Sequence, residues 1–175
     1  HTNLDKLLYH TLARTIGFND IEILYPETAV ERGLTAGLGA LVYLEKPMKL
    51  NDIIAQVKKS LKLDFVLYTG YAGKMVQRVA LMNGAGGGAI EKIIRHSAPD
   101  CIITGDVGYH HAKYANDSGV AVIDAGHFGT EIIMIGFLRE LVIDCLTNGG
   151  TAEDIPIYIS GREKNPLKLY GAGNE

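Results

Sequence analysis

The sequence predicts an α/β protein, in which a parallel or mixed β-sheet carries helices on its faces. Two observations support this prediction. From residue 76 onward, short apolar segments alternate with segments of helical periodicity, which is typical of βαβ units. The three apolar segments, 76–82, 101–104 and 120–125, are almost wholly apolar, as expected of parallel strands that are covered on both faces.

The first 75 residues contain both kinds of element. Apolar residues recur at helical spacing over 4–16, and Gly17 ends that helix. The segment 33–44 is rich in glycine and then strand-like, and Pro47 separates it from the next helix. The predicted elements are a helix at 4–16, strands at 21–25 and 33–44, a helix at 51–61 and a strand at 64–69.

The remainder of the chain is more regular. Its first strand is followed by the glycine-rich turn 83–88, and helices begin shortly after each later turn. The predicted elements are strands at 76–82, 101–104 and 120–125, helices at 89–97, 109–117 and 128–146, and a last strand at 155–160.

The composition suits one domain or one compact two-lobed unit of 175 residues. The net charge is −3 and no block of Lys or Arg occurs, so nucleic acid is not an expected partner. No apolar run reaches membrane-spanning length, so a membrane is not expected either. Cys101 and Cys145 lie in apolar contexts, which predicts buried free thiols and a cytoplasmic location.

Three polar turns follow the three parallel strands, at 83–88, 104–106 and 124–127. The carboxyl ends of consecutive parallel strands share one edge of a sheet, and open α/β sheets bind ligands at that edge. Helices begin just after the turns, and their N-termini favour anions. The sequence therefore predicts a ligand site where these turns meet.

His127 and Glu131 are the strongest candidates for metal ligands in this region. They lie four residues apart at the start of a predicted helix, which places both side chains on one face. Imidazole nitrogen and carboxylate oxygen suit zinc, iron or manganese. An isolated pair of this kind is more often an exposed His–Glu contact, but the position at the ligand-binding edge favours a metal site.

His110, His111 and Asp106 lie close to the second turn. Adjacent histidines on a helix face different directions, so one can enter the cleft while the other lies at the surface. For His110 both placements stay open, whereas His111 is expected at the surface. Asp106 is either a group that binds a ligand or orients a histidine, or the N-cap of the following helix.

The glycine run after the first parallel strand resembles a nucleotide-binding loop. Gly84, Gly86 and Ala89 nearly match the dinucleotide pattern, and Asp106 follows at a suitable distance. Alternatively, the glycines form a tight turn in which the backbone passes close to a neighbouring strand or a substrate.

VALMNGAGGG, IITGDVGYHHA and VIDAGHFGTE, together with HTNLD at 1–5, resemble the NIF-three-like family, also known as GTP cyclohydrolase one type two homologues or dinuclear metal-centre proteins. The resemblance covers nearly the whole chain. It implies a two-lobed architecture with an incomplete N-terminal lobe. Residues 1–75 are then the remainder of that lobe and the crossover, 76–175 are a C-terminal βαβαβ lobe, and no domain is inserted. It also implies a homo-oligomer, either a trimer or a hexamer.

The resemblance also implies a metal site with two divalent ions (zinc, iron or manganese) per subunit in its complete form. Asp5, His127 and Glu131 match ligand positions, whereas the family's upstream His-His pair has no counterpart in this chain. His1 and His110 match positions that line the same cleft, where either would orient the substrate or move a proton. Asp106, Gly84 and Gly86 would shape an anion pocket.

Three functions follow from these patterns. The first is a metal-dependent hydrolase of a nucleotide-like or phosphorylated small molecule, as the family resemblance to GTP cyclohydrolase implies. The second is a non-enzymatic protein that binds metal or contacts a regulator. The third is a Rossmann-like nucleotide binder without a metal.

Overall fold

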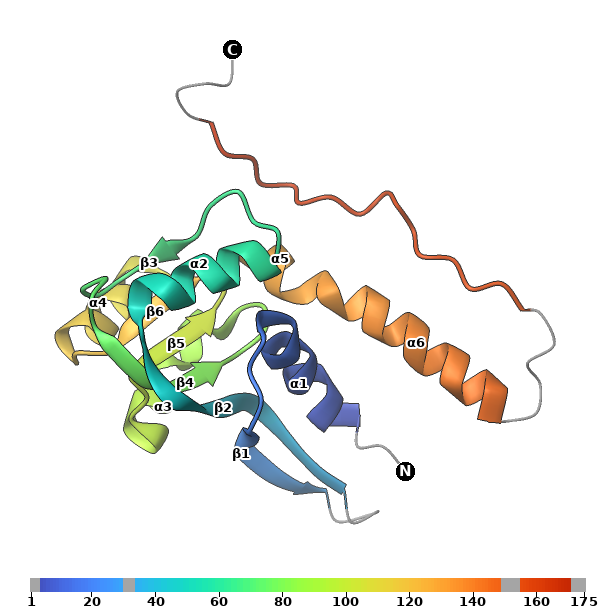
Figure 1. The fold of residues 1–175 in the computed structure, drawn as a ribbon, viewed down its shortest axis with the longest axis horizontal. Coiled ribbons are helices and arrows are strands. Elements are labelled where there is room, and N and C mark those ends of the chain that lie inside the picture. The colour runs from blue at the N-terminus through green and yellow to red at the C-terminus, as the bar shows by residue number, and fades with distance from the viewer. Residues whose placement is uncertain (1–3, 30–33, 149–154, 171–175) are drawn as a thin grey trace. The chain divides into compact units, whose positions relative to one another are not determined.

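Six strands form a single mixed sheet in the order β1-β2-β4-β5-β6-β3 (Figure 1). The computed structural model describes residues 4–29, 34–148 and 155–170. These residues divide into two units, 1–134 and 135–175, and the sheet belongs to the first. The strands are β1 (Ile21–Ala29), β2 (Leu34–Lys49), β3 (Leu67–Tyr68), β4 (Met75–Leu81), β5 (Cys101–Thr104) and β6 (Ala121–Asp124).

The parallel strands β4, β5 and β6 form the centre of the sheet and are buried on both faces. Alternate side chains enter two separate apolar clusters, as the two-residue period of a strand requires. In β5, for example, Cys101 and Ile103 lie in one cluster and Ile102 lies in the other. The predicted α/β class, with three apolar parallel strands, is confirmed.

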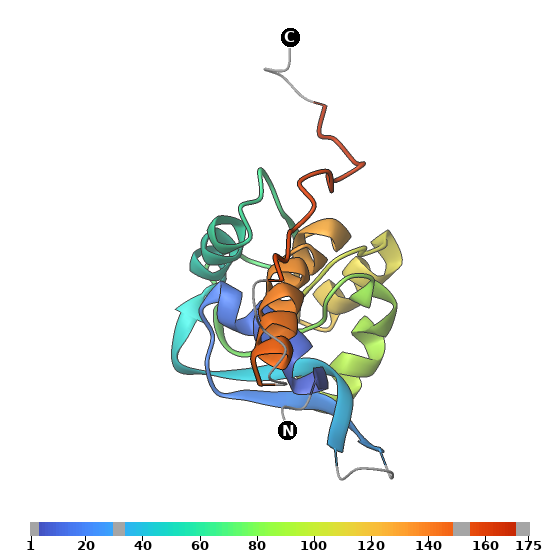
Figure 2. The same cartoon turned by 90° about the vertical axis from the view of Figure 1, so that its right-hand side faces the viewer.

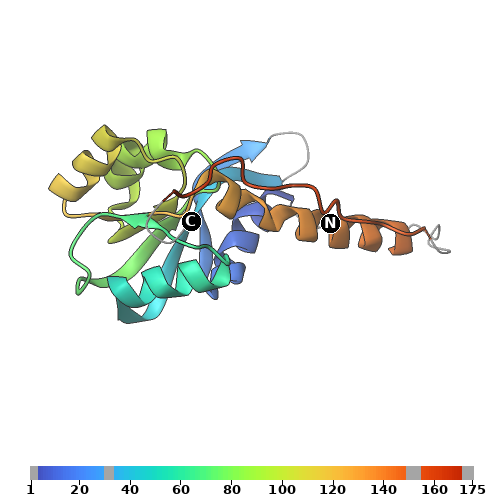
Figure 3. The same cartoon turned by 90° about the horizontal axis from the view of Figure 1, so that it is seen from above.

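Helices cover both faces of this sheet (Figures 2 and 3). On one face, α1 (Leu4–Ile16) and α2 (Leu50–Ser60) contribute Leu12, Ile53 and Val57 to the larger cluster. On the other, α3 (Ile90–Ser97) and α4 (Tyr109–Asp117) contribute Ile93 and Ala115 to the smaller cluster. A short 3₁₀ helix, η1 (Gly86–Ala89), leads into α3.

Two predictions in the first 75 residues need correction. Pro47 does not end a strand: β2 runs on to Lys49, because a register shift between Tyr43 and Met48 interrupts its pairing with β4 at the proline, which has no N–H to donate. The strand predicted at 64–69 is only two residues long and pairs antiparallel with β6, which makes the sheet mixed.

The region after β6 also differs from the prediction. The helix predicted at 128–146 is two helices, α5 (His127–Glu131) and α6 (Ile133–Asn148). No residue of α6 is buried, and Cys145, predicted to be buried, is exposed. Residues 155–160 are not a strand and are mostly exposed, because no strand pairs with them in the described chain.

Within the described residues, no helix combines the length and the apolar character that crossing a membrane would require. The predicted lobe boundary between residues 75 and 76 stays a prediction. Strands from both sides of it share one sheet.

Candidate functional site

The turns after β4, β5 and β6 meet at the carboxyl edge of the sheet, as the strand order predicts. The amide of Gly105 donates to the carbonyl oxygen of Gly84 at 3.0 Å, and the amide of Ala125 donates to that of Thr104 at 2.8 Å. These backbone hydrogen bonds join the three turns into one rim.

Glycine at two positions allows this close approach. Gly84 has φ +60°, and a Cβ there would overlap the Glu131 carboxylate and lie 3.2 Å from His127 Nε2. A Cβ on Gly86 would overlap the Thr104 hydroxyl. The packing therefore accounts for both glycines without a bound nucleotide, and their predicted role in a cofactor pocket stays a prediction.

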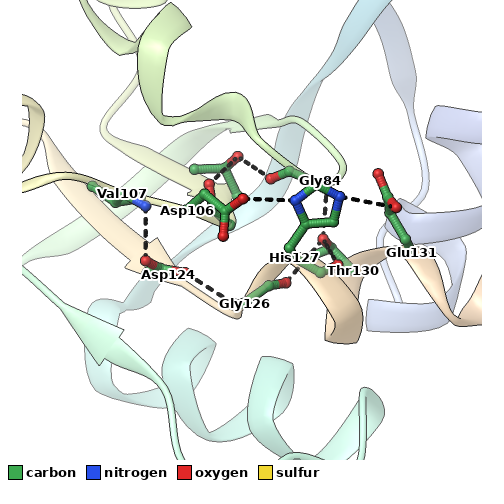
Figure 4. Close-up of polar contacts among 10 residues, drawn as sticks. Gly84, Asp106, Val107, Asp124, Gly126, His127, Thr130 and Glu131 are labelled. Carbon is green, nitrogen blue, oxygen red and sulfur yellow. Dashed lines mark hydrogen bonds and ion pairs between the residues drawn. The ribbon is translucent and has the colours of Figure 1, made fainter. Parts of the chain in front are cut away.

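His127 lies between two carboxylates on the rim (Figure 4). Its Nδ1 is 2.7 Å from Asp106 Oδ2, and its Nε2 is 3.1 Å from Glu131 Oε2. All three side chains are about half exposed, at 46% for His127, 50% for Asp106 and 51% for Glu131. A ligand in solution can therefore reach this row.

Asp106 is held in place by its own backbone and by Asp124. Its φ of +55° is in the left-handed region, which turns the chain sharply after β5. The Asp124 carboxylate accepts hydrogen bonds from the amides of Val107 and Gly126, each at 2.9 Å, and so ties the two turns together. The alternative role of Asp106 as an N-cap is wrong, because Gly108 is the N-cap of α4.

Thr130 fixes α5 against the glycine-rich turn. Its hydroxyl accepts a hydrogen bond from the Gly84 amide at 2.9 Å and lies 3.0 Å from the His127 carbonyl oxygen, to which it donates. The side-chain amide of Asn83 donates through its Nδ2 to the Thr130 carbonyl oxygen at 3.0 Å. Thr130 is fully buried, so it positions His127 and Glu131 without facing solvent.

The pKa of His127 is raised above its usual value. The hydrogen bond to Asp106 is the largest cause, and the negative charge of Glu131 adds to it, whereas partial desolvation opposes both. Both carboxylates favour a positive charge at the imidazole.

The structure brings some of the predicted site residues together and leaves others apart. Asp106, His127 and Glu131 form the row described above, and Gly84 lies beside it. His110 is exposed in the first turn of α4, where its ring contacts Tyr109 edge-on at 5.6 Å between centroids.

Two predicted residues fall where side chains are not described. His1 lies outside the described residues, and Asp5 lies in α1 with its side chain outside them. Among the described residues, no group of three or more His, Cys, Asp or Glu side chains is arranged to hold a metal ion. The predicted ligands Asp5, His127 and Glu131 therefore stay a prediction as a set.

Sequence reasoning missed the parts played by Thr130 and Asp124. Thr130 directly precedes Glu131 and has no motif of its own, so only the three-dimensional packing reveals its role. Asp124 ends an apolar strand, which is a usable signal for a residue that ties neighbouring turns.

The chain is similar in sequence to known proteins. The chain is 34% identical over 172 residues to the GTP cyclohydrolase 1 type 2 homolog of Clostridium acetobutylicum, a match that covers 97% of this chain and 62% of that relative. It is 28% identical over 168 residues to the Bacillus subtilis protein of the same name, over 94% of this chain and 43% of that one.

Solved structures show the same fold at lower identity. Staphylococcus aureus protein SA1388 matches with a TM-score of 0.81 at 21% identity, over 93% of this chain and 64% of that one. A Bacillus cereus protein related to NIF3 also matches with a TM-score of 0.81, at 16% identity, over 93% of this chain and 69% of that one.

The Duf34/NIF3 (NGG1p interacting factor 3) family profile matches residues 1–166. This match confirms the resemblance inferred from the motifs, although the chain spans only 62% of the length of its Clostridium acetobutylicum relative. The chain belongs to the Duf34/NIF3 family.

Proposed function

We infer that His127 and Glu131 bind a divalent metal ion, and that the site serves a metal-dependent hydrolase of a nucleotide-like or phosphorylated small molecule. The observation that supports this most strongly is the row of Asp106, His127 and Glu131. In that row, the Asp106 carboxylate contacts Nδ1 of His127 and the Glu131 carboxylate contacts Nε2.

When the His127 ring is neutral, its neighbours decide which ring nitrogen carries the proton. The Asp106 carboxylate can only accept, so Nδ1 carries the proton and donates it. Nε2 then presents a lone pair to the Glu131 carboxylate, which also has only lone pairs to offer. Two acceptors 3.1 Å apart need a cation to join them, either a second proton on the ring or a metal ion.

The donor set fits a divalent ion. Nitrogen and oxygen ligands of zinc lie about 2.0–2.2 Å from the ion, so two ligands of one ion are separated by at most about 4.3 Å. The 3.1 Å between His127 Nε2 and Glu131 Oε2 meets this condition. Asp106 would fix the ring and make it a stronger donor, as carboxylates behind metal-binding histidines do. Asp5 is proposed as a further ligand, and zinc, iron and manganese all suit such ligands, with two ions per subunit in the complete site.

When bound, a divalent ion supplies Lewis acidity, which lowers the pKa of water and makes it a nucleophile near neutral pH. The chain's own residues prepare the site for it. Thr130 anchors the first turn of α5, Gly84 leaves room beside Glu131, and Asp106 holds the His127 proton on Nδ1. His110 and His1 are proposed to orient the substrate or move a proton, and Asp106 with Gly84 and Gly86 to shape its pocket.

The substrate class rests on the relatives, which carry the name GTP cyclohydrolase 1 type 2 homolog. A homo-oligomer, a trimer or a hexamer, is part of the same proposal. The second candidate is a non-enzymatic metal-binding or regulator-contacting protein. It is favoured by the small number of ligands in the described residues and by the family description, NGG1p interacting factor 3. The Rossmann-like nucleotide binder has less support, because close packing explains Gly84 and Gly86.

Metal content and turnover separate these candidates. The chain is loaded with Zn²⁺ or Mn²⁺, dialysed and measured by elemental analysis, alongside His127→Ala, Asp106→Asn and the control His111→Ala. We expect His127→Ala to lose the metal, Asp106→Asn to weaken its binding about tenfold, and His111→Ala to retain it. Equal metal retention by His127→Ala would overturn the proposal. Metal binding without turnover of any nucleotide in a panel would favour the second candidate.

A further inference from the structure

A hollow beside α3 lies apart from the row at His127. It has a volume of about 500 Å³, and its lining residues are Tyr25, Gly88, Glu91, Lys92, Arg95 and His96. Most of them lie on the outward side of α3, and Tyr25 comes from β1. Clefts of this volume hold small molecules of nucleotide size.

The lining carries an excess of positive charge. Arg95 is paired with Glu91, and these two charges cancel. The ammonium of Lys92 lies over the ring of Tyr25, 4.5 Å from its centroid, and is left without a carboxylate among the contacts of the described residues. The ring of His96 packs against the same tyrosine at 4.8 Å between centroids. The hollow is therefore cationic on a chain whose net charge is −3.

Tyr25 supplies an independent sign of a missing ligand. Its phenol oxygen is buried and has no hydrogen-bond partner among the side chains that the structure describes, and burial raises the pKa of the phenol. A buried O–H that finds no acceptor is destabilising, and such groups are rare in native proteins. Within the described part of the chain, a phenol without an acceptor thus lies on the same tyrosine whose ring a lysine without a carboxylate covers.

The glycine-rich turn connects to this hollow. A Cβ on Gly88 would meet nothing within 4 Å, so the backbone is open to a ligand there. Gly84, at the other end of the same turn, faces His127 and Glu131. Close packing explains why residue 84 is a glycine, but it does not explain the glycine at position 88.

We propose that the hollow formed by Tyr25, Lys92 and His96 beside Gly88 binds the phosphate group of a phosphorylated small molecule. Phosphate oxygens accept hydrogen bonds from ammonium, imidazole N–H and phenol donors. The anion would pair with the Lys92 ammonium, which lies over the tyrosine ring, and would accept from the phenol O–H. The negative net charge of the chain and the absence of a basic block favour a small molecule over a nucleic-acid backbone. The proposal stands on different residues from the metal site and does not depend on it.

Titration of the chain with pyrophosphate tests the proposal. Binding is followed by calorimetry at constant ionic strength and by the imidazole proton signal of His96, which should move. Lys92→Gln is expected to weaken binding about tenfold, the loss of one charged hydrogen bond. Tyr25→Phe, which keeps the ring and removes only the hydroxyl, is expected to weaken it about threefold to tenfold.

Lys58→Gln is the matched control, because Lys58 is an exposed lysine on α2, on the opposite face of the sheet. It should leave pyrophosphate affinity within about twofold of the unmodified chain. Equal losses in Lys58→Gln and Lys92→Gln would mean unspecific charge attraction and would overturn the proposal. So would absence of binding at millimolar pyrophosphate, or an unchanged affinity in both Lys92→Gln and Tyr25→Phe. The folded state of each variant is checked by thermal unfolding.

Discussion

The parallel centre of the sheet and helix α6 are both strongly apolar, yet they differ in what surrounds them. Every residue of β5 is buried, whereas no residue of α6 is. Leu138 and Val142 of α6 are 47% and 44% exposed, and Ile102 and Ile103 of β5 are fully buried. An apolar pattern therefore shows only that a segment can be buried. It stabilises the fold where a neighbouring element packs against it.

The largest expected effect compares these two regions directly. Ile103→Ala should lower the free energy of unfolding by about 3–4 kcal/mol, because it leaves a cavity in a fully buried cluster. Leu138→Ala should lower it by less than about 0.5 kcal/mol, since the side chain is already half exposed. Urea unfolding measures both values. An equal loss in the two variants would show that α6 is buried in solution and would break the comparison.

A smaller effect is expected where the turns meet. Gly84→Ala should destabilise the chain by about 2 kcal/mol, because the residue has φ +60° and its new Cβ overlaps the Glu131 carboxylate. Gly88→Ala is the control within the same turn, and its Cβ meets nothing. Thermal unfolding should separate the two variants clearly. If they unfold alike, the rim is less tightly packed than described.

Two threonines sharpen the comparison further. Thr130→Val keeps the shape of the side chain but leaves the buried Gly84 amide without an acceptor, and should lower stability by about 1–2 kcal/mol. Thr147→Val removes a hydroxyl on exposed α6 that donates to the Ile143 carbonyl oxygen, and should change stability by less than about 0.5 kcal/mol. Urea unfolding again provides the measurement.

The smallest expected effect is the pH dependence of the metal-free chain. The pKa of His127 is raised in the folded state, so the stability it contributes is fully present below its unfolded pKa and is lost as pH rises through the folded value. Asp106→Asn removes the main cause and should lower this pKa, as NMR titration of the imidazole would record. Asp117→Asn, at a carboxylate paired with Lys113, is the control and should leave the His127 pKa unchanged.

Local sequence signals predicted the elements whose partners follow closely along the chain. β5 and α4 have the predicted bounds, because an apolar run and a helical period define them without distant help. The strand predicted at 155–160 is wrong, since alternation of apolar residues cannot supply a neighbouring strand. The strand end predicted before Pro47 is wrong for a related reason. A register shift in the pairing with β4 accommodates the proline within β2, and the proline alone does not reveal that shift.

The site was partly predictable in the same way. Four-residue spacing and strand order placed His127 beside Glu131 at the carboxyl edge. The contact between His127 and Asp106 spans 21 residues and depends on the left-handed turn at Asp106. Local periodicity carries no information on such a turn, nor on how Thr130 meets Gly84 behind it.

The two cysteines differ in a way that makes the chain convenient to label. Burial raises the pKa of the Cys101 thiol to about 12, so this residue contributes almost no thiolate and is shielded from reagents. Cys145 on α6 is exposed. A maleimide fluorophore should therefore attach at Cys145 alone without mutagenesis, leaving the sheet untouched. Its emission would report directly on the polarity around α6, and so on any molecule that comes to cover that helix.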